Sequence, residues 1–485
     1  MRSLLVLAVG LSAAGVLPAV AVARRSPVVV FLSPLVGAGM AAVAALIELS
    51  VGGSLVVDYA AVAVTVNCAV IGWWLAARRA AQPRAVPAWR WSIVTVLIML
   101  GCLAIPLTAL QAPMFGWDAN SIWLTHALMV YGGHHELLTG LQNVAYQFSN
   151  PDYPPLVPAA GALAFEFFGL GNLHLAVDMT VLLTACAVGV VGTGIAAAGL
   201  GGRRPARITA VTVAGAICLV SFAVSGVAEV QGLTDLLWAA TAAGAVIWGL
   251  VLPRSTQALA VAWICAAVAS LTKNEGLTTA LLVLVLIALR YRPLTLRPGT
   301  PPRPLAREWA ERVGFVVLPA LPGLAWAGLI RLIGVHDAFF KSASTETPLT
   351  RAEATMAGMA PHLAVAPVAV AVLLAGWWFL RGDRERAHLG NPAWLWISCA
   401  GALAIIFATY TAGGFEIHWW LATSVSRTTI FAQVLLYSDI AVWMVMAADG
   451  ALTRTDGQSS PHRDDPVTNR HDADRPSWSS RARAA

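Results

Sequence analysis

Charged residues are scarce in this chain of 485 residues. Asp, Glu, Lys and Arg together make up 12% of the sequence, against about 25% in an average soluble domain, while 58% of the sequence is apolar. A water-soluble protein of this length needs far more charged surface to stay monomeric. The composition therefore excludes a cytosolic enzyme, a disordered chain and a fibrous repeat, and it indicates a protein embedded in a lipid bilayer.

Lysine is scarcer still, and paired cysteines are absent. Lys273 and Lys341 are the only lysines, so arginine supplies nearly all of the positive charge. The six cysteines lie inside apolar runs and none belongs to a C-x-x-C motif, which favours buried hydrophobic cysteines over disulfide or metal chemistry. No basic stripe with interleaved aromatic residues indicates nucleic-acid binding.

Apolar runs long enough to form membrane-spanning helices recur along the chain. A helix needs about 20 apolar residues to cross roughly 30 Å of hydrocarbon. We therefore predict an all-α polytopic membrane protein with about thirteen transmembrane helices, two of which are joined by the short KNEG turn as a hairpin. The thirteen runs are 3–23, 27–50, 54–77, 91–111, 172–199, 208–228, 232–252, 256–272, 276–290, 313–334, 360–380, 392–412 and 428–448.

The placement of the arginines predicts how these helices are oriented. When the short apolar segment 155–170 is taken not to cross, 25 of the 31 basic residues fall in one set of alternate loops. Cytoplasmic loops of membrane proteins carry such an excess of Lys and Arg. The count predicts a multi-pass protein of the cell membrane with an outer amino terminus, and segment 155–170 lies along the outer interface or dips in and returns. The tail 449–485 is polar and is predicted to be disordered in the cytoplasm.

The longest outer loop spans residues 111–171. Loops of this length are usually functional or disordered, and this one is too apolar and aromatic to be disordered. It contains the sequence WDANSIW, in which Trp117 and Trp123 are typical of the membrane interface. From the residues alone, Asp118 has three interpretations: a functional acid, a helix N-cap, or a solvated loop carboxylate.

Two motifs of this loop resemble a known superfamily. W-D-A-x-S-I-W at 117–123, followed some thirty residues later by D-Y-P-P-L-x-P at 152–158, is similar to the GT-C superfamily of polyprenyl-phosphate-sugar-dependent glycosyltransferases. The likeness is to the bacterial relatives of protein O-mannosyltransferases and aminoarabinose transferases. Three later segments extend the resemblance: GLTDLLW at 232–238, SLTKNEGL at 270–277 and HWWLATSVSR at 418–427.

The resemblance implies a domain organisation and a fold. It covers roughly residues 110–440 and leaves 1–90 as extra N-terminal membrane helices. The GT-C-like catalytic domain is then 91–448, followed by the cytoplasmic tail. Its outer loop is expected to fold into two interfacial helices, and the active site is expected on the extracytoplasmic face.

The resemblance also implies an activity. An inverting glycosyltransferase of this kind moves a monosaccharide from a polyprenyl-phosphate donor in the membrane to a cell-envelope glycan, lipid or protein. Asp118 is expected to be the general base that takes the proton of the acceptor hydroxyl. Lys273 and Arg427 are expected to receive the charge that develops on the leaving phosphate. From the residues alone, Lys273 can instead pair with Glu275, and Arg427 can be an interfacial anchor.

The remaining candidates are substrate-binding residues with less definite roles. Trp117 lies next to the expected base, and consecutive prolines present Asp152 and Tyr153 at the membrane surface. Asp152, Asp235 and Glu275 can hold sugar hydroxyls, orient the two cations or bind a divalent ion. No cluster of His and Asp has ligand spacing, so the metal site stays unassigned and a divalent cation is the one cofactor left open.

Two other classes of function remain open. Transporters and flippases usually place charges near the membrane midplane and show two related halves. Here Glu48, Asp58, Arg331 and Asp439 are scattered through the predicted spans, and no two halves match. A non-catalytic protein of envelope assembly with the same fold also fits the sequence, which does not specify the sugar, the acceptor or the oligomeric state.

Overall fold

The computed structural model describes residues 2–23, 26–80, 116–200, 233–290, 305–335, 346–380 and 391–458, with a few positions between 96 and 101. The regular elements of these ranges are helices, and no strand occurs among them. Seven helices are long and apolar enough to cross a membrane, or eight if one bent pair is counted as a single span. The described part of the chain is therefore that of an all-α, multi-pass membrane protein.

The helices fall into two length classes. The longer ones are α1 (Arg2–Ala23), α2 (Val28–Val51), α3 (Leu55–Ala80), α8 (Leu173–Leu200), α13 (Leu305–Leu332), α16 (Ala393–Ala412) and α18 (Ile430–Gln458). The shorter ones of the membrane bundle are α10 (Asp235–Val246) with η3 (Ile247–Val251), α11 (Thr256–Thr272), α12 (Asn274–Arg290), α14 (Pro348–Met359), η4 (Ala360–Leu363), α15 (Ala366–Leu380) and α17 (Ile417–Thr428).

The prediction of thirteen spans is not confirmed. Eleven of the thirteen apolar runs coincide with helices, whereas most of 91–111 and all of 208–228 lie outside the described residues. Helices α11 and α12 have 17 residues each, which is the lower limit for crossing a bilayer. Only Lys273 separates these two helices, and they pack against each other, so the predicted hairpin is present.

Small residues bring the first two helices into close contact. A Cβ atom on Gly15 would lie 2.1 Å from the carbonyl oxygen of Ser33, and one on Gly37 would lie 2.2 Å from that of Leu11. Glycine at these positions allows the two backbones to approach closely, as is common between membrane helices. The buried core runs from α1 through to α18 without a break, so the N-terminal helices share it with the rest of the bundle.

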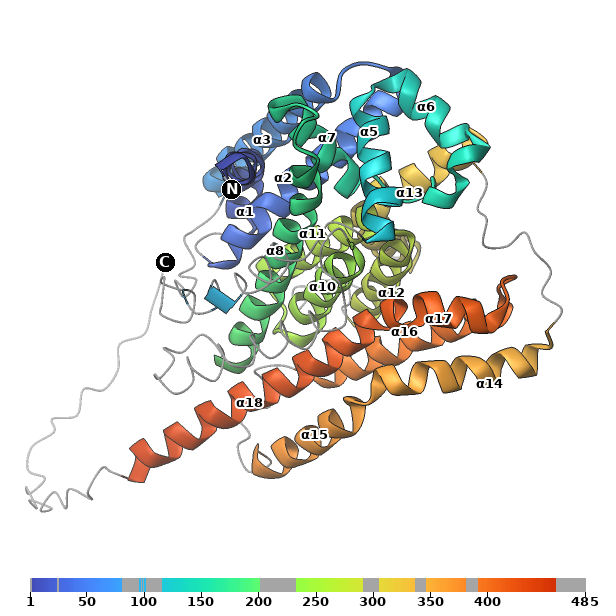
Figure 1. Cartoon of the computed structure of the whole chain (residues 1–485). Coiled ribbons are helices and arrows are strands. Elements are labelled where there is room, and N and C mark those ends of the chain that lie inside the picture. The colour runs from blue at the N-terminus through green and yellow to red at the C-terminus, as the bar shows by residue number, and fades with distance from the viewer. Residues whose placement is uncertain are drawn as a thin grey trace, which may run out of the picture.

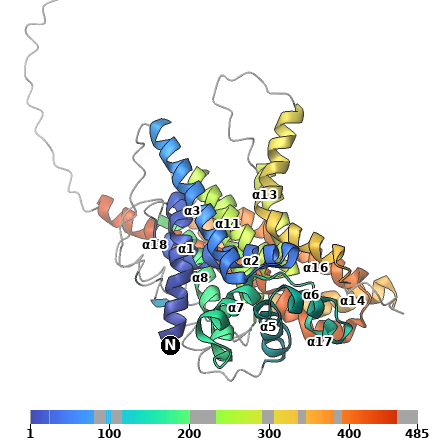
Figure 2. The same ribbon diagram turned by 90° about the horizontal axis from the view of Figure 1, so that it is seen from above.

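The remaining helices form layers around α10, α11 and α12 (Figure 1). Helix α8 contacts α10 and α18, and α13 contacts α11 and α12. Helix α18 runs along α15 and α16, and α14 contacts α16 and α17. The second view draws α14 and α17 on the same side of the bundle as the short helices α5 (Thr125–Tyr131) and α6 (His134–Gln142) (Figure 2), whereas the first view draws α6 and α14 apart (Figure 1).

The long loop 111–171 folds, over its described part, into five short helical segments. They are η1 (Ala119–Leu124), α5 (Thr125–Tyr131), α6 (His134–Gln142), η2 (Val144–Ser149) and α7 (Leu156–Phe168). The resemblance predicts two interfacial helices, so the observed loop is more divided than expected. Helix α7 has 13 residues and a length of roughly 20 Å, too short to cross the bilayer, as predicted for segment 155–170.

The C-terminal helix is longer than predicted. Helix α18 continues to Gln458, so residues 449–458 are helical and the disordered tail cannot begin at 449. No proline interrupts this stretch, and a packed helix extends readily because each added residue gains one hydrogen bond. The rest of the predicted tail, 459–485, lies outside the described residues.

Candidate functional site

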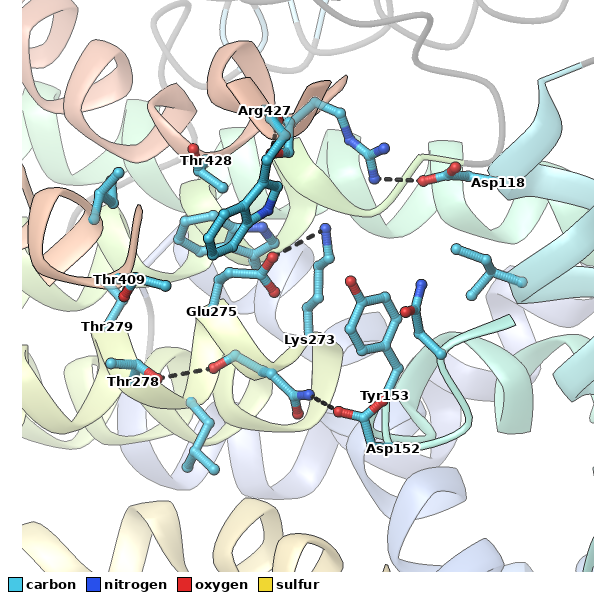
Figure 3. A pocket seen from close by; sticks show the side chains of 18 of the residues that line it. Asp118, Asp152, Tyr153, Lys273, Glu275, Thr278, Thr279, Thr409, Arg427 and Thr428 are labelled. Atoms are coloured by element: carbon cyan, nitrogen blue, oxygen red, sulfur yellow. Dashed lines mark hydrogen bonds and ion pairs between the residues drawn. The ribbon is translucent and has the colours of Figure 1, made fainter. Parts of the chain in front are cut away.

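One cavity of about 1080 Å³ collects nearly all of the residues singled out in the sequence (Figure 3). Its walls come from the folded outer loop and from α12, α13, α16 and α17. Seven of the eight predicted site residues line it, namely Trp117, Asp118, Asp152, Tyr153, Lys273, Glu275 and Arg427. The eighth, Asp235, lies behind the wall, where it contacts two of the seven.

Arg427 joins two carboxylates across the cavity wall. Its guanidinium forms an ion pair with Asp118, and its Nε donates to Oδ2 of Asp235 at 2.9 Å. Arg427 keeps a quarter of its side-chain surface exposed, whereas Asp235 keeps 2%. The fork of the guanidinium suits two oxygen acceptors at once. Arg427 is therefore fixed from behind by Asp235 and presents its other edge to Asp118 and the cavity.

Lys273 is held by the same buried carboxylate. Its Nζ lies 2.7 Å from Oδ1 of Asp235 and 3.4 Å from Oε1 of Glu275. Burial alone would lower the pKa of Lys273, but the negative charges of Asp235 and Glu275 raise that pKa above its usual value. The pairing with Glu275 that the sequence allows is present, yet Asp235 is the closer partner. Lys273 is therefore a permanent cation in the cavity wall.

The position of Lys273 depends on a break between two helices. The residue has extended backbone angles (φ −159°, ψ 159°) at the end of α11, so its side chain leaves the hairpin toward the cavity. Gly276, three residues later, faces the opposite helix, where a Cβ atom would lie 2.1 Å from the carbonyl oxygen of Ala269. In the sequence KNEG, the lysine thus directs its side chain toward the cavity, and the glycine allows α11 and α12 to pack closely.

Tyr153 packs between Trp123 and Lys273. Its ring stacks on Trp123 with centroids 5.5 Å apart, and the Nζ of Lys273 lies 5.3 Å from its centroid. Burial raises the pKa of Tyr153 above its usual value, so its hydroxyl stays protonated. Trp123 is buried, so its ring packs inside the protein against Tyr153.

The other residue of the D-Y-P-P motif anchors the loop to the hairpin. Asp152 accepts a hydrogen bond from the side-chain amide of Asn274, and its carbonyl oxygen accepts one from the indole of Trp326 at 2.8 Å. Asn274 is also the first residue of α12 and directly follows Lys273. Asp152 therefore lines the cavity and holds the loop against α12 and α13.

The structure disagrees with two of the three interpretations of Asp118. It precedes the π-helix η1 but makes no side-chain capping hydrogen bond, and 13% of its side-chain surface is exposed. A helix cap and a solvated loop carboxylate both disagree with these contacts. A π-helix is often found at functional sites, and here it begins beside the carboxylate that pairs with Arg427.

Some residues of the cavity were not singled out in the sequence. The hydroxyl of Tyr410 lies 2.6 Å from that of Ser424 and 3.2 Å from that of Thr428, which links α16 to α17 near Arg427. Asn150 and Phe148 also line the cavity. The motif HWWLATSVSR contains Ser424, but a tyrosine in an apolar run carries no signal of its own.

The open question of a metal ion can be examined over the described residues. No group of three or more His, Cys, Asp and Glu side chains within them is arranged to hold a metal ion. Asp118 and Glu275 in the cavity wall, and Asp235 behind it, form ion pairs with Arg427 and Lys273.

The fold and the cavity define a class of protein: a multi-pass α-helical membrane protein with a charged cavity at one end of its bundle. Comparisons of the chain with models of known families, with curated proteins and with solved structures find no match. The function is therefore argued from the cavity.

Proposed function

We propose that this protein is an inverting membrane glycosyltransferase that transfers a monosaccharide from a polyprenyl-phosphate donor to an extracytoplasmic acceptor. The observation that carries the proposal is that the lining of one cavity combines a group of charged side chains with many apolar ones. Asp118, Arg427, Lys273 and Glu275 lie together in its wall, and an apolar surface makes up much of the remainder. The apolar part comprises Leu277, Ala327, Ile330, Ala402, Ile405, Ile406, Phe415 and Phe431.

Such a cavity suits an amphiphilic ligand. Ligand sites are usually apolar with a few placed polar groups, and the volume of about 1080 Å³ slightly exceeds the usual range of roughly 300–1,000 Å³. A lipid-linked sugar phosphate has an apolar chain, a single anionic group and a polar sugar. The apolar wall fits the chain, the cations fit the phosphate, and the carboxylates fit the sugar.

The proposed reaction gives a role to three of these charged groups. Asp118 takes the proton of the acceptor hydroxyl while that oxygen forms a bond to the anomeric carbon. On the opposite face of the sugar, the bond from the anomeric carbon to the phosphate oxygen breaks, and its electrons leave with the phosphate. Arg427 and Lys273 stabilise this negative charge.

Asp235 acts on the two cations rather than on the substrate. It is buried behind the wall and binds both Lys273 and Arg427. Because one carboxylate binds both side chains, it holds Lys273 and Arg427 at a constant separation. We therefore classify Asp235 as a positioning residue. Of the roles that the sequence leaves open for it, this is the orientation of the two cations.

The test is transfer of a radiolabelled monosaccharide in proteoliposomes. The donors are polyprenyl phosphates that carry mannose, glucose or arabinose, and the acceptors are soluble oligosaccharides, a Ser- and Thr-rich peptide and a diacylglycerol. We expect transfer with at least one pair, and Asp118→Asn should lower its rate by about 10²–10⁴-fold while donor binding is retained.

Two results contradict the proposal. Transfer that is unchanged in Asp118→Asn would remove the base, and donor binding without any transfer in the wild type would favour a non-catalytic envelope protein. Glu353→Gln on α14 is the matched control, because Glu353 does not line the cavity and its substitution changes one carboxylate without touching the ion pairs.

A further inference from the structure

Exposed aromatic rings lie beside Asp118 and bear on the class of acceptor. Trp117 directly precedes this carboxylate and lines the cavity with 59% of its surface exposed. Its ring meets that of Phe148, also in the lining and half exposed, with centroids 6.1 Å apart. Tyr146 follows at 6.3 Å from Phe148 and is 38% exposed. Three exposed rings are thus linked by successive contacts, with interplanar angles of 63° and 44°, and the first ring belongs to the residue before the proposed base.

We propose that this aromatic row, Trp117, Phe148 and Tyr146, is the acceptor subsite and that the acceptor is an oligosaccharide. The inference rests on the proposed function, because it takes the residue beside the row to be the base. It goes further by choosing a glycan over a lipid or a protein as the acceptor.

The chemistry of the row matches a carbohydrate. A sugar ring has one face of C–H groups, which packs on the flat surface of an exposed aromatic ring, and an edge of hydroxyl groups. Tyrosine and tryptophan combine an apolar face with a polar group for such mixed surfaces. Asn150 and Asp152 also line the cavity, and they supply amide and carboxylate groups for hydroxyls. A single ring would fit one sugar, whereas a row of three fits a chain of sugars.

The support beneath the row is rigid. Tyr146 and Phe148 belong to η2, whose first turn is capped by the side chain of Asn143. At its other end the hydroxyl of Ser149 donates to the carbonyl of Tyr146 at 2.7 Å, and Nε2 of the buried His126 lies 3.1 Å from the same hydroxyl. Rings that are held in place while exposed lose little entropy when a ligand binds. This arrangement fits a recognition surface.

Oligosaccharide binding in nanodiscs without any donor tests the subsite independently of catalysis. The probes are linear hexose and pentose oligosaccharides of two to four units, followed by saturation-transfer NMR. We expect at least one series to bind, and Trp117→Ala to weaken every length about tenfold while Trp117→Phe keeps most of the affinity. Tyr146→Ala should weaken the tetrasaccharide more than the disaccharide, which a general loss of structure would not do.

Trp73→Ala is the matched control, since Trp73 is as exposed as Trp117 (58%) but does not line the cavity. Absence of binding for all oligosaccharides overturns the subsite, as does equal weakening by Trp73→Ala and Trp117→Ala. Label that enters only the peptide or the lipid, with Asp118-dependent transfer, refutes the subsite and leaves the proposed function standing. Oligosaccharide binding that depends on Trp117 without any transfer supports the subsite and refutes the proposed function.

Discussion

Asp235 and Lys273 form a buried ion pair with 2.7 Å between Oδ1 and Nζ, although 38 residues separate them in the chain. Side-chain exposures of 2% and 3% remove both groups from solvent. Because Asp235 also binds Arg427, one hidden carboxylate fixes two cations of the cavity. The charged side chains of the wall therefore form a connected network, and substitution of Asp235 at its centre affects both cations.

Asp235→Asn should destabilise the folded protein more than any other single change in this network. The substitution leaves the buried Lys273 and the partly exposed Arg427 without their shared anion, and breaking a buried pair typically costs about 3–5 kcal/mol. We expect a lower melting temperature in detergent, measured by intrinsic fluorescence. Glu275→Gln is the control, since Glu275 is partly exposed and its loss should cost less than about 1 kcal/mol. Equal melting temperatures for the two variants would disprove the central role of Asp235.

Arg427→Lys should lower transfer at least tenfold without loss of the fold. The ammonium of lysine is a point charge, and it cannot reproduce the forked contacts to Asp118 and Asp235. Asp118 and Asp235 then each lose a hydrogen-bond donor, and the leaving phosphate loses a donor of fixed orientation. The comparison variant is Arg307→Lys, at an exposed ion pair on α13. If both variants retain full transfer rates, the geometry of Arg427 does not matter for the reaction.

Gly276→Ala should disturb the hairpin that carries Lys273 and Glu275. An added Cβ atom would lie 2.1 Å from the carbonyl oxygen of Ala269, so α11 and α12 must move apart. We expect lower stability together with weaker donor binding. Gly39→Ala in α2 meets no atom within 4 Å and should be neutral or stabilise the helix by about 0.5–1 kcal/mol. A Gly276→Ala variant with native stability and donor affinity would show that the helices separate freely.

Motifs of the sequence predict which residues meet, but not how they pair. All eight site residues come to one place, and the hairpin through KNEG forms as expected. The nearest partner of Lys273 is Asp235, not the adjacent Glu275. Which carboxylate reaches a lysine depends on the packing of α10 against α11 and α12, and such distant contacts leave no trace in local spacing.

The burial of Trp123 and the extent of α18 illustrate two further limits. An aromatic residue in an outer loop can pack inside the protein or face the lipid, and the structure shows that Trp123 packs against Tyr153. The polar composition of 449–458 predicts disorder, yet the helix continues to Gln458. Composition describes what a segment contains, whereas the packed helix before it determines whether it stays ordered.

The stability of the outer loop should fall below about pH 6.5 because of His126. Burial lowers the pKa of this histidine to about 4, whereas it is about 6.5 in an unfolded chain. Between these pH values the histidine is protonated in the unfolded state but not in the folded state. The free energy of unfolding is therefore highest above pH 6.5 and decreases as the pH falls toward 4. The loss is at most roughly 3 kcal/mol.

This dependence can be measured from the melting temperature of the wild type and of His126→Gln between pH 7.5 and pH 4.5. The difference between the two proteins should change in that interval, because the glutamine does not titrate. A constant difference would show that His126 takes up its proton in the folded state as readily as in the unfolded one.

Cysteine labelling should place the cavity and the arginine-rich segment 290–312 on opposite sides of the membrane. The excess of basic residues in alternate loops predicts that this segment is cytoplasmic, and the proposed reaction requires an outer cavity. Val144 lies in η2 beside the aromatic row and is strongly exposed. In a cysteine-free background, Val144→Cys in intact cells should react with an impermeant maleimide, and Thr300→Cys should react only after the membrane is opened. Labelling of both positions from the same side would overturn the predicted number of spans between them. Reaction of Val144→Cys only after the membrane is opened, with Thr300→Cys reacting in intact cells, would reverse the assigned orientation and remove the outer-face reaction.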